Sequence, residues 1–239
     1  VFACGVKSLS GDKYMQKIKK IIVVGADEVA LLVAATLSFN LRHVEVVVVD
    51  GAPKISSGLV ESSMENIGAF LNLAGIDIDH FISRTNPTVN LGNKFQDWST
   101  AGQQFTHCFG DCGVAFGGTE FHQILVRFAK EGKPEKISDF SLTAAFVETG
   151  KKFPQDYHSG EGLPQVASGL NFSIHAFTTF LVAHLQRLGV KRTAENVIKV
   201  NLADDGRISS LITNTGQVIT ADFYIDCSGS SSQLLGEAM

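Results

Sequence analysis

Phosphate binding is the first chemistry that the residue pattern of this chain suggests. Gly25 follows the apolar run 21–24 and precedes a stretch rich in Ala and Leu, which is how a dinucleotide-binding βαβ unit begins. The expected pattern G-x-G-x-x-G is present only as Gly25-x-Asp27-x-x-Ala30. Gly25 and Ala30 are therefore candidate cofactor contacts, because alanine is accepted at the third position of this motif.

Asp27 places a carboxylate where the second glycine normally lets the backbone approach a pyrophosphate. Two like charges ~4 Å apart at an effective dielectric of ~20 repel by roughly 4 kcal/mol. Since ~1.4 kcal/mol is a factor of ten, this repulsion would cost up to about three decades of affinity. A side chain turned to solvent would cost less. The pattern thus indicates the fold more strongly than it indicates tight dinucleotide binding.

Asp50 is a candidate ligand for a ribose hydroxyl. It ends a second apolar run, 44–49, and lies 25 residues after Gly25. An acidic residue at about this spacing bonds the ribose in dinucleotide-binding units. The alternative is that Asp50 is simply the polar residue at which a parallel strand ends.

The elements that would position these residues follow from apolar periodicity. We expect helices over 61–74 and 177–188, a β-meander over 197–202, 208–213 and 218–219, and a buried strand over 223–225. A nucleotide-binding start whose sheet is completed by a late strand is typical of two-dinucleotide-fold flavoproteins. The sequence therefore predicts an α/β, FAD/NAD(P)-binding Rossmann-like fold with an inserted region.

Composition describes an ordinary globular chain of 239 residues, with 44% hydrophobic and 18% charged residues. A net charge of −4 without a basic stripe gives no reason to expect nucleic acid, and no apolar stretch is long enough for a membrane span. The cysteines do not suggest a disulfide framework, so we expect a cytoplasmic protein. Cys108 and Cys112, beside His107, have no second ligand pair at suitable spacing, so no metal site is predicted.

Several dispersed segments, from about Ile18 to Met239, resemble the flavin-dependent halogenases of the tryptophan-halogenase family. The strongest is A-D-F-Y-I-D-C-S-G over 221–229, which is close to the family's A-D-L-F-I-D-C-S-G. Segment 90–98 resembles K-x-x-I-K-F-x-N-W, segment 73–77 resembles the family's Leu-Gly-Ile stretch, and segment 171–175 resembles H-F-D-x-x. Their collinear order is more informative than any single motif.

The resemblance implies a flavoenzyme whose FAD is reduced by a separate flavin reductase. In the family, reduced FAD, oxygen and chloride or bromide yield hypohalous acid, which travels through a tunnel to a lysine beside an aromatic substrate such as tryptophan or indole. The implied partners are therefore a small aromatic substrate, a halide and a flavin reductase. No oligomeric state follows from the resemblance.

The resemblance also assigns cofactor-binding residues. Glu61 lies in the segment 58–63, which corresponds to the family's V-G-E-A-T flavin loop. Asp226 and Gly229 would lie near the flavin ribityl chain and pyrophosphate, and the alternative is a strand-ending turn without a ligand. Val197 would offer backbone groups to the adenine, while its side chain joins the core.

Departures from the family pattern predict impaired activity. Asn90 stands where the family has its tunnel lysine, and it has no basic nitrogen. Lys94 has a family counterpart of its own and is expected to be structural. The W-x-W-x-I-P motif is absent, because Trp98 is the only tryptophan. The family's halide site and assisting glutamate would lie beyond Met239, so we assign no catalytic residue and expect the fold to be incomplete at its C-terminus.

We expect residues 1–14 to lie outside the fold, 15–79 and 172–239 to form two parts of an FAD-binding domain, and 80–171 to form an inserted substrate-side region. Three functions remain open. The first is an impaired flavin-dependent halogenase. The second is a non-catalytic relative that acts in binding or assembly. The third is an oxidoreductase or monooxygenase that binds FAD or NAD and does not halogenate.

Overall fold

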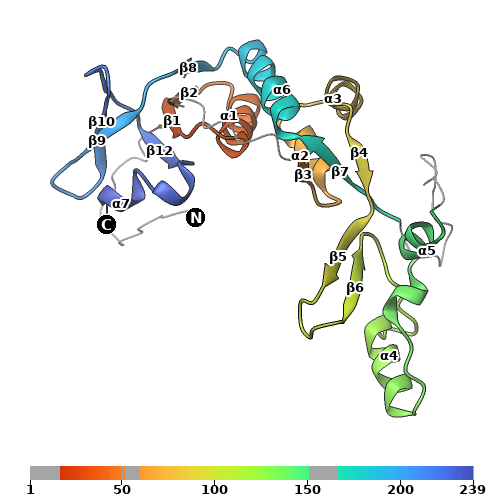
Figure 1. Ribbon diagram of the computed structural model, residues 1–239. Helices are drawn as coiled ribbons and strands as arrows, with labels where there is room; N and C mark the ends of the chain where they lie inside the picture. The colour runs from red at the N-terminus through yellow and green to blue at the C-terminus, as the bar shows by residue number, and fades with distance from the viewer. Residues whose placement is uncertain (1–16, 50, 52–59, 151–165, 239) are drawn as a thin grey trace. The chain divides into compact units, whose positions relative to one another are not determined.

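The structure, a computed structural model, describes residues 17–49, 51, 60–150 and 166–238. The chain divides into two compact units (Figure 1). The first contains the two ends of the chain, up to residue 53 and from residue 188 onward, and the second contains 54–187. The predicted tail, residues 1–14, lies outside the described residues. The division expected at 15–79, 80–171 and 172–239 concerns FAD binding and stays a prediction.

A four-stranded sheet in the order β12-β1-β2-β8 is the framework of the first unit. Its strands are β1 (Lys20–Val24), β2 (Glu45–Val49), β8 (Lys191–Thr193) and β12 (Phe223–Asp226). All neighbouring strands are parallel. The apolar residues of β1 and β2 are buried, as expected for a sheet covered on both faces. The predicted completion of this sheet by a strand from the far end of the chain is confirmed. The expected burial of this strand is wrong, because β12 lies at the edge of the sheet, where Phe223 is 45% exposed and the other residues of the strand are half-buried.

Helix α1 (Glu28–Asn40) connects β1 to β2 and contacts both strands. Its fully buried side chains are Ala30, Leu31, Ala34 and Ala35, and small residues of this kind allow a helix to lie close to a sheet. The β1-α1-β2 motif therefore has the βαβ geometry that the apolar run before Gly25 and the helical stretch after it predict.

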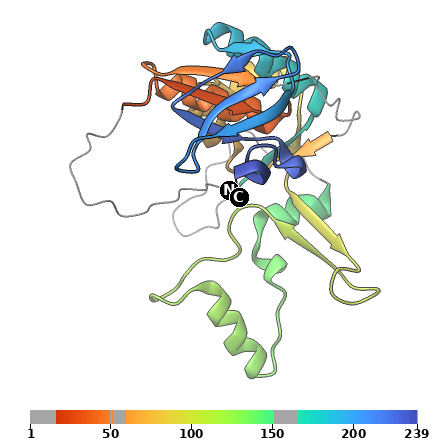
Figure 2. The same cartoon turned by 90° about the vertical axis from the view of Figure 1, so that its left-hand side faces the viewer.

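The predicted β-meander is confirmed to the residue. It comprises β9 (Val197–Leu202), β10 (Ile208–Thr213) and β11 (Val218–Ile219), paired antiparallel in the order β11-β10-β9. Figure 2 shows the meander lying over the parallel sheet. The short elements η2 (Gly229–Ser231) and α7 (Leu235–Ala238) follow β12. One core joins the parallel sheet, the meander and the segment before α7: Ile22, Val24, Val47, Val49, Val200, Leu211 and Leu234.

The second unit contains an antiparallel sheet and three helices. The sheet has the order β3-β7-β4, with β3 (Val60–Ser62), β7 (Gly169–Ser173) and β4 (Thr88–Asn90). The helices are α2 (Ile67–Leu73), α3 (Ile78–Thr85) and α6 (Ile174–Arg187). Phe81 is fully buried at their centre, and its ring lies 5.4–5.8 Å from the rings of Phe172, Phe177 and Phe180.

The helix expected over 61–74 is wrong in its first half. Residues 60–62 form strand β3, which pairs with β7 more than 100 residues later, and the helix begins only at Ile67. Strand pairing over this distance overrides local periodicity, which cannot detect it. The second expected helix is confirmed as α6, which begins three residues earlier than predicted. Gly75 and Gly189 follow α2 and α6 at positive φ, as expected for helix ends.

A hairpin and three further helical elements complete the second unit. The hairpin pairs β5 (Gly92–Gln96) with β6 (Gln104–Cys108), and Phe95 stacks on Phe105 at 4.9 Å. The helical elements are α4 (Phe121–Lys130), η1 (Ile137–Phe140) and α5 (Leu142–Thr149). None of the described helices is long and apolar enough to cross a membrane.

Candidate functional site

The carboxyl ends of β1, β2 and β12 form the edge of the sheet where dinucleotide-binding folds hold their ligand. Gly25 follows β1, is buried, and donates its N–H to the Val49 carbonyl at 3.0 Å. Its φ is +153°, and a Cβ at this position would collide with the carbonyl oxygen of Cys227, which follows β12. Glycine is therefore required at this position by the crossing of two chain segments, with or without a ligand.

Asp27 is the N-cap of α1. Its Oδ1 accepts a hydrogen bond from the Ala30 N–H at 3.0 Å, and its backbone is extended. The first-turn N–H groups of a helix are the donors that bind a phosphate in dinucleotide-binding units. The carboxylate of Asp27 is therefore held at the end of α1 where a pyrophosphate would accept hydrogen bonds, and it uses one of those donors itself. Ala30 is fully buried beneath it.

Asp226 binds four donors of the segment that follows it. Oδ1 accepts from the N–H and Oγ–H of Ser228, at 3.0 and 2.5 Å, and Oδ2 accepts from the N–H groups of Leu234 and Leu235, at 2.8 and 3.0 Å. Burial alone would raise the pKa of Asp226, but these hydrogen bonds outweigh it and hold the pKa below its ordinary value. The carboxylate is thus ionised at neutral pH, and both of its oxygens accept hydrogen bonds from the segment that follows it.

Gly229 and Val197 have different surroundings. Gly229 has a φ of +66°, and a Cβ there would meet no atom within 4 Å, so the backbone at this point borders open space. Val197 opens β9, pairs with Thr213, and packs its half-buried side chain against the core of the first unit. Its side chain is therefore part of the core, as expected, and its proposed backbone contact with adenine stays a prediction. Asp50 lies outside the described residues.

Glu61 and Asn90 belong to the second unit, on the two outer strands of its antiparallel sheet. Glu61 is exposed on β3 opposite Phe172. Asn90 is buried on β4, where its Nδ2 donates to the Ser63 carbonyl at 3.3 Å and its Oδ1 accepts from the Gly92 N–H at 3.1 Å. The Asn90 side chain therefore links the ends of neighbouring strands, and its correspondence to the family's lysine stays a prediction.

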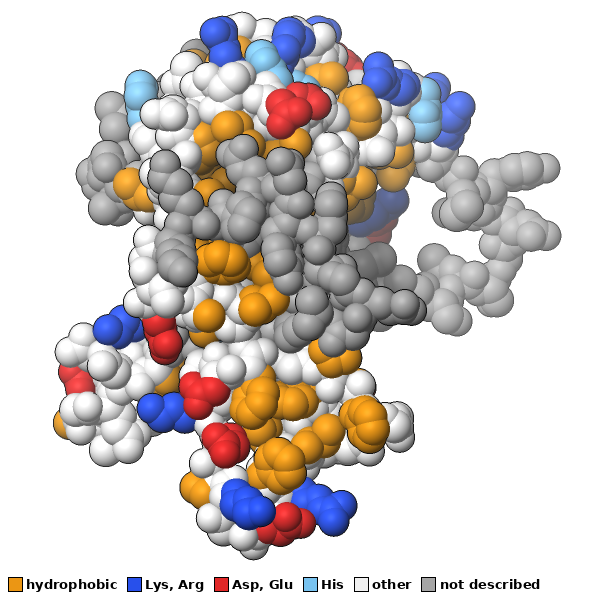
Figure 3. All heavy atoms as spheres, turned by 90° about the vertical axis from the view of Figure 1, so that its right-hand side faces the viewer, with side chains coloured by type: hydrophobic (Ala, Val, Ile, Leu, Met, Phe, Trp, Pro, Cys, Tyr) orange, Lys and Arg blue, Asp and Glu red, His pale blue; other side chains and the backbone are white. Residues whose placement is uncertain are grey.

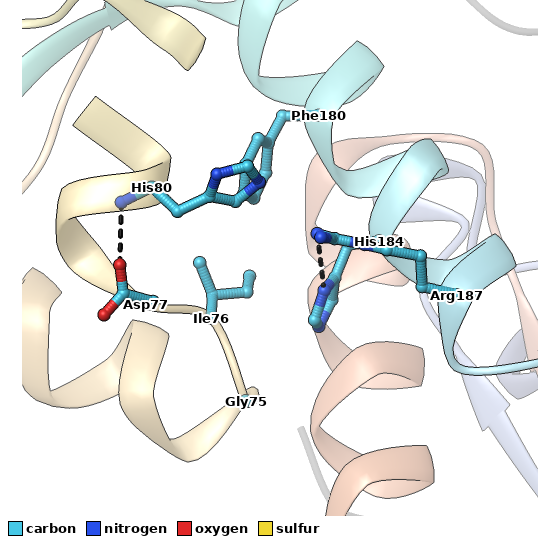
Figure 4. A pocket seen from close by; sticks show the side chains of 7 residues that line it. All are labelled: Gly75, Ile76, Asp77, His80, Phe180, His184 and Arg187. Carbon is cyan, nitrogen blue, oxygen red and sulfur yellow. Dashed lines mark hydrogen bonds between the residues drawn. The ribbon is translucent and has the colours of Figure 1, made fainter. Parts of the chain in front are cut away.

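His184 is a buried polar residue that the sequence patterns do not single out. It lines a pocket of about 380 Å³ together with Gly75, Ile76, Asp77, His80, Phe180 and Arg187 (Figure 4). Its Nε2 lies 3.0 Å from the carbonyl oxygen of Ala74, which can only accept, so Nε2 carries the proton. Nδ1 then accepts from Arg187 at 3.4 Å. The sequence signal for this residue is a histidine among the apolar residues that form the buried side of α6.

Burial lowers the pKa of His184, and the nearby Arg187 and His80 lower it further, whereas the bond to Ala74 raises it. Ala74 is the C-cap of α2, so the imidazole binds a carbonyl that the end of this helix leaves without an intrahelical partner. Both ring nitrogens are engaged. His184 therefore joins α2 to α6 and has no free nitrogen for proton transfer.

The described cysteines are free, and no group of three or more His, Cys, Asp or Glu among the described residues has an arrangement that could hold a metal ion. Burial, with a smaller effect of Asp27 and Asp226, raises the pKa of Cys227 to about 11. Its thiol is therefore protonated at neutral pH and is not a nucleophile.

A family model described as Tryptophan halogenase matches residues 20–239. The chain belongs to the tryptophan halogenase family. It is 26% identical to the tryptophan 7-halogenase RebH of Lentzea aerocolonigenes, over 93% of this chain and 44% of RebH. It is 24% identical to the tryptophan 6-halogenase SttH of Streptomyces toxytricini, over 92% of this chain and 46% of SttH. The chain thus spans less than half the length of these halogenases.

Solved halogenase structures share the fold. BrvH, a flavin-dependent halogenase from Brevundimonas sp. BAL3, matches with a TM-score of 0.79 and 27% identity, over 92% of this chain and 44% of BrvH. Xcc4156, a flavin-dependent halogenase from Xanthomonas campestris, matches with the same TM-score at 22% identity. The expected α/β flavoprotein fold is therefore confirmed.

The residues of the first unit fit a flavin dinucleotide in part. Gly25, the N-terminus of α1 and the open space beside Gly229 lie at the carboxyl edge of the parallel sheet, as dinucleotide binding requires. At the N-terminus of α1, exposed Asp27 places a carboxylate that accepts one of the first-turn N–H groups, so this position differs from the glycine that the dinucleotide-binding pattern has there.

Proposed function

We propose that this chain is the FAD-binding portion of a flavin-dependent halogenase of small aromatic compounds such as tryptophan or indole, and that Asp27 weakens its affinity for FAD. The observation that supports this most is the meeting of Gly25 and the first turn of α1 at the carboxyl ends of β1 and β12. Bound FAD, reduced by a separate flavin reductase, would supply the reaction with oxygen that oxidises the halide.

Each cofactor-binding residue has a proposed role. The backbone at Gly25 and the first turn of α1 would lie against the pyrophosphate, and the loop from Asp226 to Gly229 would lie near the ribityl chain. Asp50 would bond the adenosine ribose, and the backbone of Val197 would contact the adenine. Glu61, in the other unit, would belong to the flavin loop.

A second candidate is a relative that has lost catalysis and acts in binding or assembly. Two observations favour it. Asp27 uses its charge to cap α1, and Asn90 uses both groups of its amide to bind backbone. Neither residue therefore presents the chemistry that the family has at its position, and both serve the fold.

Titration with FAD, followed by the flavin absorption spectrum, tests the proposal. Wild-type protein should bind weakly, and Asp27→Asn should bind at least tenfold more tightly. Asparagine caps a helix as well as aspartate does, so this variant removes the charge while keeping the cap. Asp205→Asn is the matched control, since it makes the same change in net charge at an exposed turn of the meander.

Asp27→Gly removes both the charge and the side-chain cap. Glycine at an N-cap costs only a few tenths of a kcal/mol, so this variant should stay folded and also bind FAD more tightly than wild type. Equal affinities for wild type and both variants would show that the charge is not the obstacle. Absence of FAD binding to folded Asp27→Asn would contradict the proposal and favour the non-catalytic relative.

A further inference from the structure

The pocket beside His184 has charged groups of opposite sign at its two ends. It lies between α6 and the segment that joins α2 to α3, and its volume of about 380 Å³ is within the range of sites that bind small molecules. Figure 4 shows Asp77 on one side of the pocket and Arg187 on the other, with Ile76 between them. The space therefore suits a small ligand that has an apolar body and polar ends.

Exposed hydrophobic side chains alone would not indicate a ligand. Figure 3 shows many of them on the face of the molecule that it presents, and over half of an ordinary protein surface is apolar. The pocket differs because its apolar residues, Ile76 and Phe180, are only 2% and 7% exposed and line a concave space. A buried apolar wall with a few polar groups is typical of small-molecule sites.

Arg187 is the cation of the pocket. It is exposed at the end of α6, and its Nη2 lies 3.4 Å from Nδ1 of His184. A guanidinium group has further N–H donors in a fixed fork, and no carboxylate within the described ranges pairs with those of Arg187. The side chain can therefore bind a carboxylate group of a ligand through two parallel hydrogen bonds.

Asp77 is the hydrogen-bond acceptor at the other end. As the N-cap of α3, its Oδ1 accepts from the N–H of His80 at 2.8 Å. An ionised carboxylate accepts hydrogen bonds at both oxygens, and Oδ2 of Asp77 has no partner in the part of the chain that the structure describes. Asp77 can therefore accept a hydrogen bond from a hydroxyl or amino group of a ligand.

Packed rings form the wall of the pocket between these two ends. The Phe180 ring lies 5.5 Å from the imidazole of His80 and 6.4 Å from that of His184, which is stacked on it. Aromatic rings pack favourably in stacked and tilted arrangements of this kind. A flat aromatic body would extend the same packing inside the pocket.

We propose that this pocket binds a small aromatic carboxylic acid that carries a hydrogen-bond donor on the ring, opposite the carboxylate. The carboxylate would bind Arg187, the ring would lie against Ile76 and Phe180, and the donor would bind Asp77. The proposal is independent of FAD binding, because no residue that lines the pocket belongs to the carboxyl edge of the parallel sheet.

Isothermal titration calorimetry of the 239-residue chain with para-hydroxyphenylacetate tests this assignment. Binding should be saturable. The neutral para-hydroxyphenylacetamide should bind at least tenfold more weakly, because it lacks the charge that pairs with Arg187. Phenylacetate, which lacks the hydroxyl donor, should also bind more weakly than the first probe.

Arg187→Gln should weaken the binding of para-hydroxyphenylacetate at least tenfold. Arg84→Gln is the matched control, since Arg84 is exposed on α3 outside the pocket and its substitution should leave the affinity unchanged. Asp77→Asn keeps a residue that caps a helix well but removes the charge. It should reduce the difference in affinity between para-hydroxyphenylacetate and phenylacetate.

Circular dichroism spectra of the three variants should match that of wild type, because the substituted side chains are exposed. Absence of saturable binding to the wild-type chain would overturn the proposal. Binding that Arg187→Gln leaves unchanged would assign the probe to another site and would also overturn it, as would equal weakening by Arg84→Gln. Asp27→Asn should bind the probe as wild type does, so the result is separate from the titration with FAD.

Discussion

Asp27, Asp226 and His184 each bind backbone groups that the ends of helices leave unpaired. Asp27 accepts from the first turn of α1, Asp226 accepts from the two N–H groups that begin α7, and His184 donates to the carbonyl that ends α2. Such groups are costly to bury without a partner. These three side chains therefore stabilise the fold whether or not a ligand is bound. Substitutions at these positions are expected to change stability as well as any binding.

Stability should fall below about pH 6.5 because of His184. Burial lowers the pKa of its imidazole in the folded protein, so the unfolded chain takes up the proton first as the pH falls. The contribution of His184 to the free energy of unfolding is fully present above the pKa that the imidazole has in the unfolded chain. It is lost as the pH falls through the lower pKa that the imidazole has in the folded protein. Urea unfolding at pH 7.5, 6.5 and 5.5, which spans about one pH unit on either side of the ordinary histidine pKa, measures this loss of stability.

His184→Gln should reduce this dependence on pH, because glutamine retains a donor for Ala74 but does not titrate. His175→Gln is the matched control, since His175 is exposed on the same helix and its substitution should leave the dependence unchanged. An identical decline in wild type and His184→Gln would assign the effect to other groups.

At the scale of elements, the segment after β12 is organised around Asp226. Its carboxylate joins Ser228 to Leu234 and Leu235, and Ser228 Oγ accepts from the N–H of Gln233 at 2.8 Å. Leu234 belongs to the core of the first unit, and α7 contacts β9. This segment therefore holds a fixed shape beside Gly229, at the edge where FAD binding is proposed.

Asp226→Asn should lower the free energy of unfolding by about 1–3 kcal/mol, because an amide cannot accept all four hydrogen bonds. Amide exchange at Ser228, Leu234 and Leu235 should become faster. Since its pKa is lowered in the folded protein, the wild-type contribution is present above the ordinary aspartate pKa and is lost as the pH falls through the lowered value. Denaturant unfolding and hydrogen exchange by mass spectrometry measure these effects.

The control for Asp226→Asn is Asp205→Asn, which breaks an exposed ion pair with Arg207 and should change the free energy of unfolding much less than Asp226→Asn does. Equal losses in the two variants would show that the hydrogen bonds of Asp226 do not support the fold.

At the scale of the molecule, the chain spans less than half the length of the halogenases that it matches. The chain covers 44–46% of RebH, BrvH and SttH, and both groups of the Asn90 amide are bound to backbone. A substitution at one position therefore leaves the unmatched part of each relative without a counterpart in this sequence.

Asn90→Lys should yield no halogenated product with FAD, a flavin reductase, bromide and tryptophan, as measured by mass spectrometry with the tryptophan 7-halogenase RebH as the positive control. It should also lower the free energy of unfolding by about 2 kcal/mol or more, because it places an ammonium group at a buried position. Gln96→Lys, at an exposed position of β5, should cost much less. Brominated tryptophan from Asn90→Lys would contradict this expectation.

The β1-α1-β2 start and the three strands of the meander can be predicted from the sequence alone. Each of them is encoded by the apolar periodicity and turn residues of one continuous segment. The resemblance of the dispersed segments to the halogenase family, and not their periodicity, predicts that Gly25 and the late motif 221–229 lie near one cofactor. It also indicates the family, which the match over residues 20–239 shows.

Only the tertiary structure decides which groups each polar side chain meets. Strand β3 exists because it pairs with β7, His184 is satisfied by Ala74, which lies 110 residues away, and Asn90 binds a carbonyl 27 residues earlier. The conformation of Asp27 at the end of α1 likewise determines whether its charge faces solvent or the pyrophosphate position. These partners are brought together by packing of segments distant in the chain and by side-chain conformation, and local periodicity carries no information about either.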